Sequence, residues 1–159
     1  MDRLFLQNLV LFCHLLGALF FVAGIFLAGV PFEVARRRRR PHEIALLLGL
    51  TRFGVVLVAL GGLMLPGFGL WLVHLDGFEY DAEWIVLALV LFVAALLLGG
   101  LGGRRPKQAR KLAEALDSEN AEMTPQLRRL LDDPLARAAN YASALLVAVI
   151  LVLMVWKPS

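Results

Sequence analysis

Residues 44–75 read IALLLGLTRFGVVLVALGGLMLPGFGLWLVHL, and this stretch decides the fold. It contains one arginine, Arg52, and one histidine, His74, and it has no acidic residue. A helix needs about 20 predominantly apolar residues to cross the hydrocarbon core of a bilayer. We therefore predict that residues 44–75 form a transmembrane helix.

Three further stretches have the same apolar character, at about residues 4–32, 84–101 and 138–156. The chain of 159 residues is 60% hydrophobic and 18% charged, and its mean hydropathy is +0.75. A water-soluble domain of this size cannot bury so much apolar surface, a disordered chain is less hydrophobic, and a single cysteine excludes a disulfide scaffold. We predict an all-α integral membrane protein in which residues 1–159 form one domain, an antiparallel four-helix bundle.

The charges predict how this bundle is oriented, because loops that remain in the cytoplasm carry an excess of lysine and arginine. The first loop contains five consecutive arginines, Arg36–Arg40, and the long polar segment 102–137 is also basic, whereas loop 76–83 is acidic. Only two basic residues, Arg3 and Lys157, fall on the opposite side. We expect the arginine loop and residues 102–137 in the cytoplasm, and both termini and the acidic loop outside. The aromatic residues at the expected external ends agree with this orientation: Trp71, Tyr80, Trp84 and Trp156.

The cytoplasmic segment 102–137 predicts short amphipathic helices. Thr124 followed by Pro125 is typical of a helix start, and residues 107–116 form a second candidate. We interpret both as surface helices on the inner leaflet, with a basic docking site for a soluble partner as the alternative. The arginine run lies between two spans, so it indicates affinity for anionic inner-leaflet lipid rather than for nucleic acid.

Small residues predict where the spans pack together, because helices in lipid associate through close backbone approach. The first two spans supply two such stripes: Gly17, Gly24 and Ala28, and Gly54, Gly61 and Gly62. A second copy of the chain or another membrane protein could pack against the remaining faces.

Two histidines fall within or near the spans, and ionisable groups there are functional candidates. If Phe32 and Arg52 both mark the inner boundary, His14 lies 18 residues outward of it and His74 lies 22 residues outward. At the helical rise these separations are roughly 27 and 33 Å. We therefore expect both histidines in the external third of the bundle, about 6 Å apart in depth.

Two facing imidazoles suit haem iron or a transition metal. Gly17 lies one turn from His14, and Gly67 lies two turns from His74. The missing side chains at these glycines leave room for a flat macrocycle such as haem b. The pattern predicts a redox site with His14 and His74 as ligands near the external face. The alternatives are a neutral His14 bonded to a neighbouring helix and an interfacial His74.

Copper transport or handling is the second hypothesis, because thiolate and thioether ligands select Cu(I). Cys13 adjoins His14, but it points about 100° away around the helix. Met64 is expected about 15 Å deeper than His74. The alternative for Cys13 is a small core residue.

Polar side chains also occur toward the inner ends of the spans. We expect Arg52, Asn140 and Tyr141 to lie at one depth, together with Ser143. They could bind an anionic group such as a haem propionate or a lipid phosphate. The alternative is that Arg52 extends to the lipid headgroups while the other side chains make interhelical hydrogen bonds.

Several motifs together resemble a bacterial family of four-span membrane proteins described as a domain of unknown function. The motifs are His14-Leu-Leu-Gly17-Ala18, the arginine run, Gly69-Leu-Trp-Leu-Val-His74, Gly-Gly-Arg104-Arg105-Pro106 and Arg137-Ala-Ala-Asn140-Tyr141. The resemblance covers nearly the whole chain. It implies a multi-pass protein of the bacterial plasma membrane.

That family is similar, more distantly, to copper-resistance D-type proteins and to small membrane protoporphyrinogen oxidases that use haem b. The feature shared with those relatives is a histidine in the first span, which corresponds to His14. The oxidase-type lysine has no counterpart, since spans two to four contain no lysine before Lys157. This departure argues against the oxidase activity, and the resemblance leaves haem binding open. A non-catalytic accessory subunit of a membrane complex is the third hypothesis.

Overall fold

The computed structural model describes residues 3–156, which form six helices and no strand. The long apolar helices are α1 (Arg3–Arg36), α2 (Pro41–Asp76), α3 (Glu83–Gly102) and α6 (Pro134–Trp156). Two amphipathic helices, α4 (Arg104–Ser118) and α5 (Pro125–Leu131), lie between α3 and α6. The predicted all-α fold with four membrane-length helices is confirmed. Lys157 lies outside the described residues.

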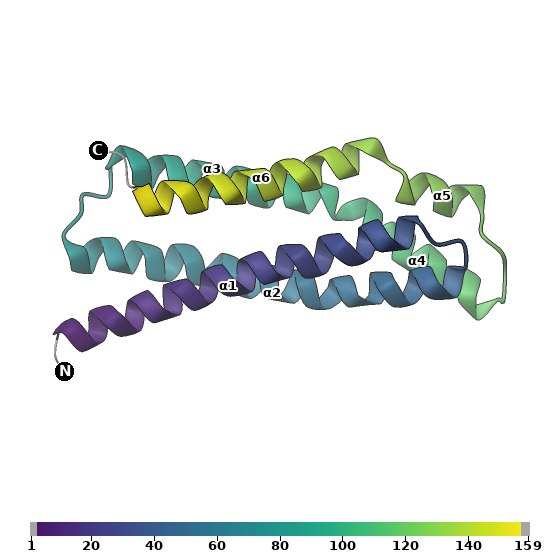
Figure 1. The fold of residues 1–159 in the computed structure, drawn as a ribbon, viewed down its shortest axis with the longest axis horizontal. Helices are drawn as coiled ribbons and strands as arrows, with labels where there is room; N and C mark the ends of the chain where they lie inside the picture. Colours follow the sequence, from purple (N-terminus) through teal and green to yellow (C-terminus); the bar gives the residue numbers. More distant parts are fainter. Residues whose placement is uncertain (1–2, 157–159) are drawn as a thin grey trace.

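The long helices are arranged as two antiparallel pairs, α1 with α2 and α3 with α6 (Figure 1). The first residues of α1 and the last residues of α6 lie at the same end as the α2–α3 loop. We call this the acidic end, because the loop carries Asp76, Glu79, Asp81 and Glu83. The α1–α2 loop, α4 and α5 lie at the opposite end, which we call the basic end.

Glycine residues set the close contact between α1 and α2. A Cβ atom on Gly61 would lie 2.5 Å from the carbonyl oxygen of Gly17 and 2.5 Å from the backbone nitrogen of Phe21. A Cβ atom on Gly24 would lie 2.6 Å from the backbone nitrogen of Val58. No larger residue fits at these positions while the backbones stay in place, so the predicted use of small residues for packing is confirmed.

The second pair is joined by a buried polar contact. The hydroxyl of Ser143 on α6 donates to the carbonyl oxygen of Ala95 on α3 at 2.8 Å. Phe21 of α1 packs in one apolar cluster with Ala95 and Val147. This cluster connects the two helix pairs near the middle of the bundle.

The largest apolar core lies at the basic end, where α4 and α5 pack on α1 and α2. Thr124 caps α5 by accepting a hydrogen bond from the backbone N–H of Leu127 at 3.2 Å. The predicted helices of this segment are confirmed, but their apolar faces lie against protein rather than against the membrane surface. The fully buried core side chains are Ala35, Ile44, Leu48, Ala109, Ala113, Leu127 and Leu131.

Candidate functional site

His14 lies at the interface between α1 and α2. Its Nδ1 atom is 3.1 Å from the carbonyl oxygen of Leu65, so the Nδ1–H group donates to this carbonyl. Gly69 faces the same ring, because a Cβ atom there would lie 3.0 Å from Cε1 of His14. In a neutral imidazole this contact leaves Nε2 unprotonated and able to bind a ligand.

The glycine that accommodates the His14 ring is therefore Gly69, and Gly17 does not have the expected role. A Cβ atom on Gly17 would lie 2.7 Å from Cβ of Met64, so helix α2 already fills the space beside it. Gly67 has no neighbouring heavy atom within 4 Å of a built Cβ. The expected gap for a flat macrocycle at Gly17 is not present.

The expected pairing of His14 with His74 is also not formed within one chain. Gly69 faces His14, and His74 follows five residues later, about 140° further around α2. His74 is exposed. His74 lies near Asp76, and Asp76 accepts a hydrogen bond from Gln7 of α1. Gln7 lies two helical turns from His14, toward the acidic end, so His74 is also about two turns from His14 along the bundle. This separation along the bundle is roughly 10 Å.

The predicted depths were wrong because Phe32 and Arg52 do not lie at one level. Phe32 packs in the same cluster as Leu48, one turn nearer the basic end than Arg52. The same register places Met64 opposite Gly17, one turn from His14. Cys13 is a free, half-buried thiol. Among residues 3–156, no group of three His, Cys, Asp or Glu side chains could hold a metal ion.

The three residues expected to bind an anionic group are not brought together. Arg52 points to α4, where its Nη2 atom lies 3.9 Å from a glutamate oxygen. Asn140 lies against Gly102 of α3. Tyr141 donates from its hydroxyl to Glu33 of α1 at 2.9 Å. Asn140 and Tyr141 are neighbours in sequence, so they point about 100° apart around α6.

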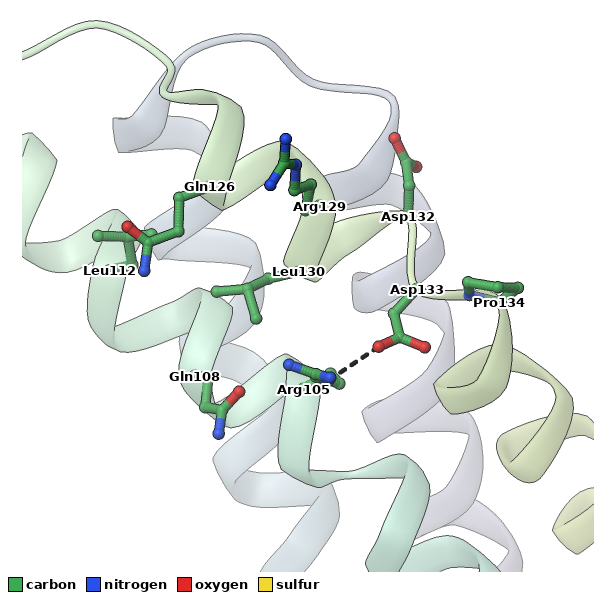
Figure 2. Close-up of a pocket in the computed structure, with 9 residues that line it drawn as sticks. All are labelled: Arg105, Gln108, Leu112, Gln126, Arg129, Leu130, Asp132, Asp133 and Pro134. Carbon is green, nitrogen blue, oxygen red and sulfur yellow. Dashed lines mark ion pairs between the residues drawn. The ribbon is translucent and has the colours of Figure 1, made fainter.

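A pocket of about 870 Å³ opens at the basic end, between α4, α5 and the start of α6. Figure 2 shows Leu112 of α4 and Leu130 of α5 between the two helices. Polar side chains surround them, including Gln108, Gln126 and Arg129. The pocket is an amphipathic site that the sequence argument did not identify.

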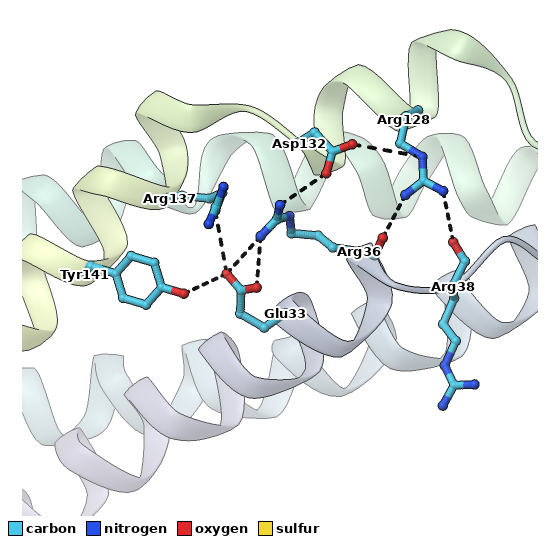
Figure 3. Close-up of polar contacts among 7 residues, drawn as sticks. All are labelled: Glu33, Arg36, Arg38, Arg128, Asp132, Arg137 and Tyr141. Carbon is cyan, nitrogen blue, oxygen red and sulfur yellow. Dashed lines mark hydrogen bonds and ion pairs between the residues drawn. The ribbon is translucent and has the colours of Figure 1, made fainter.

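Glu33 joins α1 to α6 at the same end (Figure 3). Its carboxylate accepts two hydrogen bonds from Nη1 of Arg36, at 2.9 and 3.2 Å, and one from Tyr141. The Nε atom of Arg137 lies 3.8 Å from the same carboxylate. One carboxylate therefore faces two guanidinium groups and a hydroxyl.

Helix α5 extends this network to the last turn of α1. Arg36 contacts Asp132 through Nη2 at 3.2 Å. Arg128 donates to the carbonyl oxygens of Arg36, at 2.7 Å, and of Arg38, at 3.5 Å. The last carbonyls of a helix have no partner within the helix, so Arg128 caps the end of α1 from another helix.

Sequence reasoning placed Glu33 in a loop and gave it no role. An acidic residue three positions before Arg36 was a signal, because residues three apart on a helix are neighbours. Its other partners, Arg137 and Tyr141, are about a hundred residues away in the chain.

The comparison with known families agrees with these four long apolar helices. A family model described as a predicted integral membrane protein, DUF2269, matches residues 8–158. The chain belongs to the DUF2269 family. No curated protein and no solved structure matches the chain significantly.

This DUF2269 protein is therefore a multi-pass integral membrane protein with four spans. The matched region contains His14, the pocket at the basic end and the network around Glu33. Both ends of the bundle thus belong to the family domain. The family description gives a location in the membrane and no activity.

Proposed function

We propose that this DUF2269 protein binds haem b through His14 and serves a redox role in the membrane. The observation that carries the proposal is the contact between Nδ1 of His14 and the Leu65 carbonyl oxygen at 3.1 Å. Histidine ligands of metals usually donate their other ring N–H to a carbonyl or carboxylate, which fixes the tautomer and the ring orientation. The contact therefore supports Nε2 as the ligand atom.

Haem suits this site better than a metal ion that needs several protein ligands. The porphyrin supplies four of the ligands of iron, and a single proximal histidine is enough in several protein classes. The described residues offer no cluster of three His, Cys, Asp or Glu side chains that could hold a metal ion. His14 contacts a backbone carbonyl within the apolar part of the bundle, whereas the other histidine held by a neighbouring helix, His42, contacts Asp117 at the basic end. Bound haem would supply one-electron transfer.

The position of His14 also favours a ligand role. Ionisable residues inside membrane spans are costly and rare. His14 lies in an otherwise apolar stretch, and Gly69 keeps space for its ring at the α1–α2 interface. We propose that the basic end faces the cytoplasm of a bacterial cell, which puts His14 in the half of the bundle nearer the outside.

Copper handling is the second candidate, because Met64 lies one helical turn from His14. Cys13, His14 and Met64 offer a thiol, an imidazole and a thioether within a short segment of the interface. These are the ligand types that Cu(I) prefers. A colourless parent protein that contains bound copper would favour this candidate. The Cys13→Ala variant should then lose the copper.

The deciding experiment is the visible absorption spectrum of protein purified in mild detergent from haem-replete cells. The parent protein should show a Soret band at about one haem per chain, as expected for a single axial site. His14→Ala should lose this band while circular dichroism stays helical, and added imidazole should restore part of it. His74→Ala is the matched control, since His74 is exposed, and it should keep the band.

Two results would overturn the haem assignment: a colourless parent protein, or an unchanged spectrum in His14→Ala. A colourless parent with no copper that purifies stably with a second membrane protein would instead indicate an accessory subunit.

A further inference from the structure

The pocket at the basic end has an apolar interior and a polar rim (Figure 2). Leu112 and Leu130 are half-buried, and their other sides pack against the main core of this end. Arg105 of α4 lines the pocket three residues after α3 ends at Gly102. Pro134, the first residue of α6, also lines it. The pocket therefore lies where two membrane-length helices end.

Both carboxylates of the pocket are already paired within the chain. Asp133 lies 2.8 Å from Nε of Arg105, and it accepts hydrogen bonds from two backbone N–H groups in the first turn of α6. Asp132 contacts Arg36 at 3.2 Å. These pairs neutralise the acidic charge and leave little to repel an anion.

Three donors of the rim remain unused. The side chains of Arg129, Gln126 and Gln108 make no hydrogen bond or ion pair with any residue in the range 3–156. In Figure 2, Gln126 and Arg129 stand on α5 and Gln108 stands on α4, around the two leucines. The rim can therefore donate hydrogen bonds to a ligand without breaking a contact of the folded chain.

More unpaired positive charge adjoins the pocket on α4. A smaller hollow is lined by Arg104, Lys107, Lys111 and also Gln108, so the two hollows share one side chain. The three basic side chains are exposed and form no ion pair within the described part of the chain. The surroundings of the pocket thus have a net positive charge.

We propose that this pocket binds an anionic phospholipid, with the phosphate at Arg129, Gln126 and Gln108 and the hydrocarbon against Leu112 and Leu130. Guanidinium and amide N–H groups match the oxygens of a phosphate. Basic pockets at the membrane ends of spans are suited to anionic headgroups. An apolar floor at the level where α3 and α6 end favours a lipid over a soluble acidic protein. The proposal does not depend on haem binding.

Native mass spectrometry of the detergent-solubilised full chain tests this site. Phosphatidylglycerol should bind more tightly than phosphatidylcholine, and Arg129→Gln should weaken the first bound phosphatidylglycerol about fivefold, which corresponds to the loss of one basic contact near a membrane surface. Gln126→Ala should weaken it less. Arg39→Gln controls for the general attraction of the arginine run to anionic lipid, because Arg39 is an exposed arginine at the same end whose side chain makes no hydrogen bond or ion pair within residues 3–156.

Equal affinity for the two lipids, or equal losses in Arg129→Gln and Arg39→Gln, would overturn the site. A second titration uses glycerol phosphate, which lacks hydrocarbon. Competition by glycerol phosphate at the same concentration as the lipid would show a free phosphate site and overturn the lipid assignment. Displacement of the lipid by a polyglutamate peptide, with no preference between lipids, would instead indicate an acidic protein partner.

Discussion

The hydroxyl of Tyr141 on α6 donates a hydrogen bond to the carboxylate of Glu33 on α1 across 2.9 Å. This contact joins the first and last membrane-length helices, which meet at few other points along the bundle (Figures 1 and 3). Apolar surfaces gain little from contact with each other inside lipid. Polar contacts such as this one therefore contribute to holding the two helix pairs together.

Glu33→Gln should destabilise the protein more than Tyr141→Phe. The amide keeps the shape of the side chain but removes the charge that faces Arg36 and Arg137, and the Nε atoms of both arginines are already buried without a hydrogen bond. Loss of a partner at a partly buried charged group costs about 1–3 kcal/mol, and loss of the tyrosine hydroxyl costs about 1 kcal/mol. Unfolding in mixed micelles measures both changes.

Glu43→Gln provides the control for these variants. Glu43 lies 3.8 Å from Arg38, both side chains are well exposed, and such surface pairs contribute about 0–1 kcal/mol. A loss in Glu33→Gln no larger than in Glu43→Gln would show that the Glu33 network does not stabilise the bundle.

Gly61→Ala should destabilise the protein, whereas Gly29→Ala should not. The added methyl at position 61 would lie 2.5 Å from backbone atoms of α1, whereas the methyl at position 29 would meet no heavy atom within 4 Å. Overpacking at a close contact costs typically about 1–3 kcal/mol, while alanine at an open helical site is neutral or slightly favourable. Thermal unfolding in one detergent compares the two. Equal stability would contradict the close α1–α2 contact.

The helices could be predicted because apolar length is a local property of the sequence. The contacts between helices could not, because they depend on which turns of α1 and α2 face each other. The sequence argument assumed that Phe32 and Arg52 lie at the same depth. This wrong assumption was enough to predict that His14 and His74 face each other. Glycines 17, 24, 54 and 61 carried the true register, since each needs a backbone opposite it.

The polar network was harder to predict for a related reason. Glu33 receives its contacts from α1 and α6, and its importance follows from partners that are distant in sequence. Arg129 and Gln126 look like ordinary polar residues of a short amphipathic helix. Their role in a pocket depends on how α5 packs against α4, which the sequence does not specify.

The orientation of the bundle predicts where added cysteines can be labelled. In a Cys13→Ala background, Asp81→Cys at the acidic end should react with a membrane-impermeable maleimide in intact cells, because the positive end is expected inside. Ser118→Cys at the basic end should react only after the cells are opened. Both positions are exposed, so accessibility in detergent checks that each thiol is reactive. The reverse labelling pattern would show that the basic end faces outward.

Gly69→Ala should disturb the His14 ring without changing the histidine itself. An added methyl would lie 3.0 Å from Cε1 and 3.2 Å from Nδ1 of His14. The ring must then shift by a few tenths of an ångström, which weakens its contact with the Leu65 carbonyl oxygen. Changes in groups that orient a ligand commonly reduce metal affinity 10–100-fold. We therefore expect at least about a tenfold loss of haem affinity, measured by haem titration of the apoprotein.

Gly67→Ala is the matched control on the same helix, because position 67 has no heavy atom within 4 Å of a built Cβ. It should retain both the haem spectrum and the melting temperature of the parent protein. Equal haem affinity in the two variants, with His14→Ala colourless, would mean that the ligand is held without the Leu65 contact. The orienting role assigned to α2 would then be wrong, although His14 would remain the ligand.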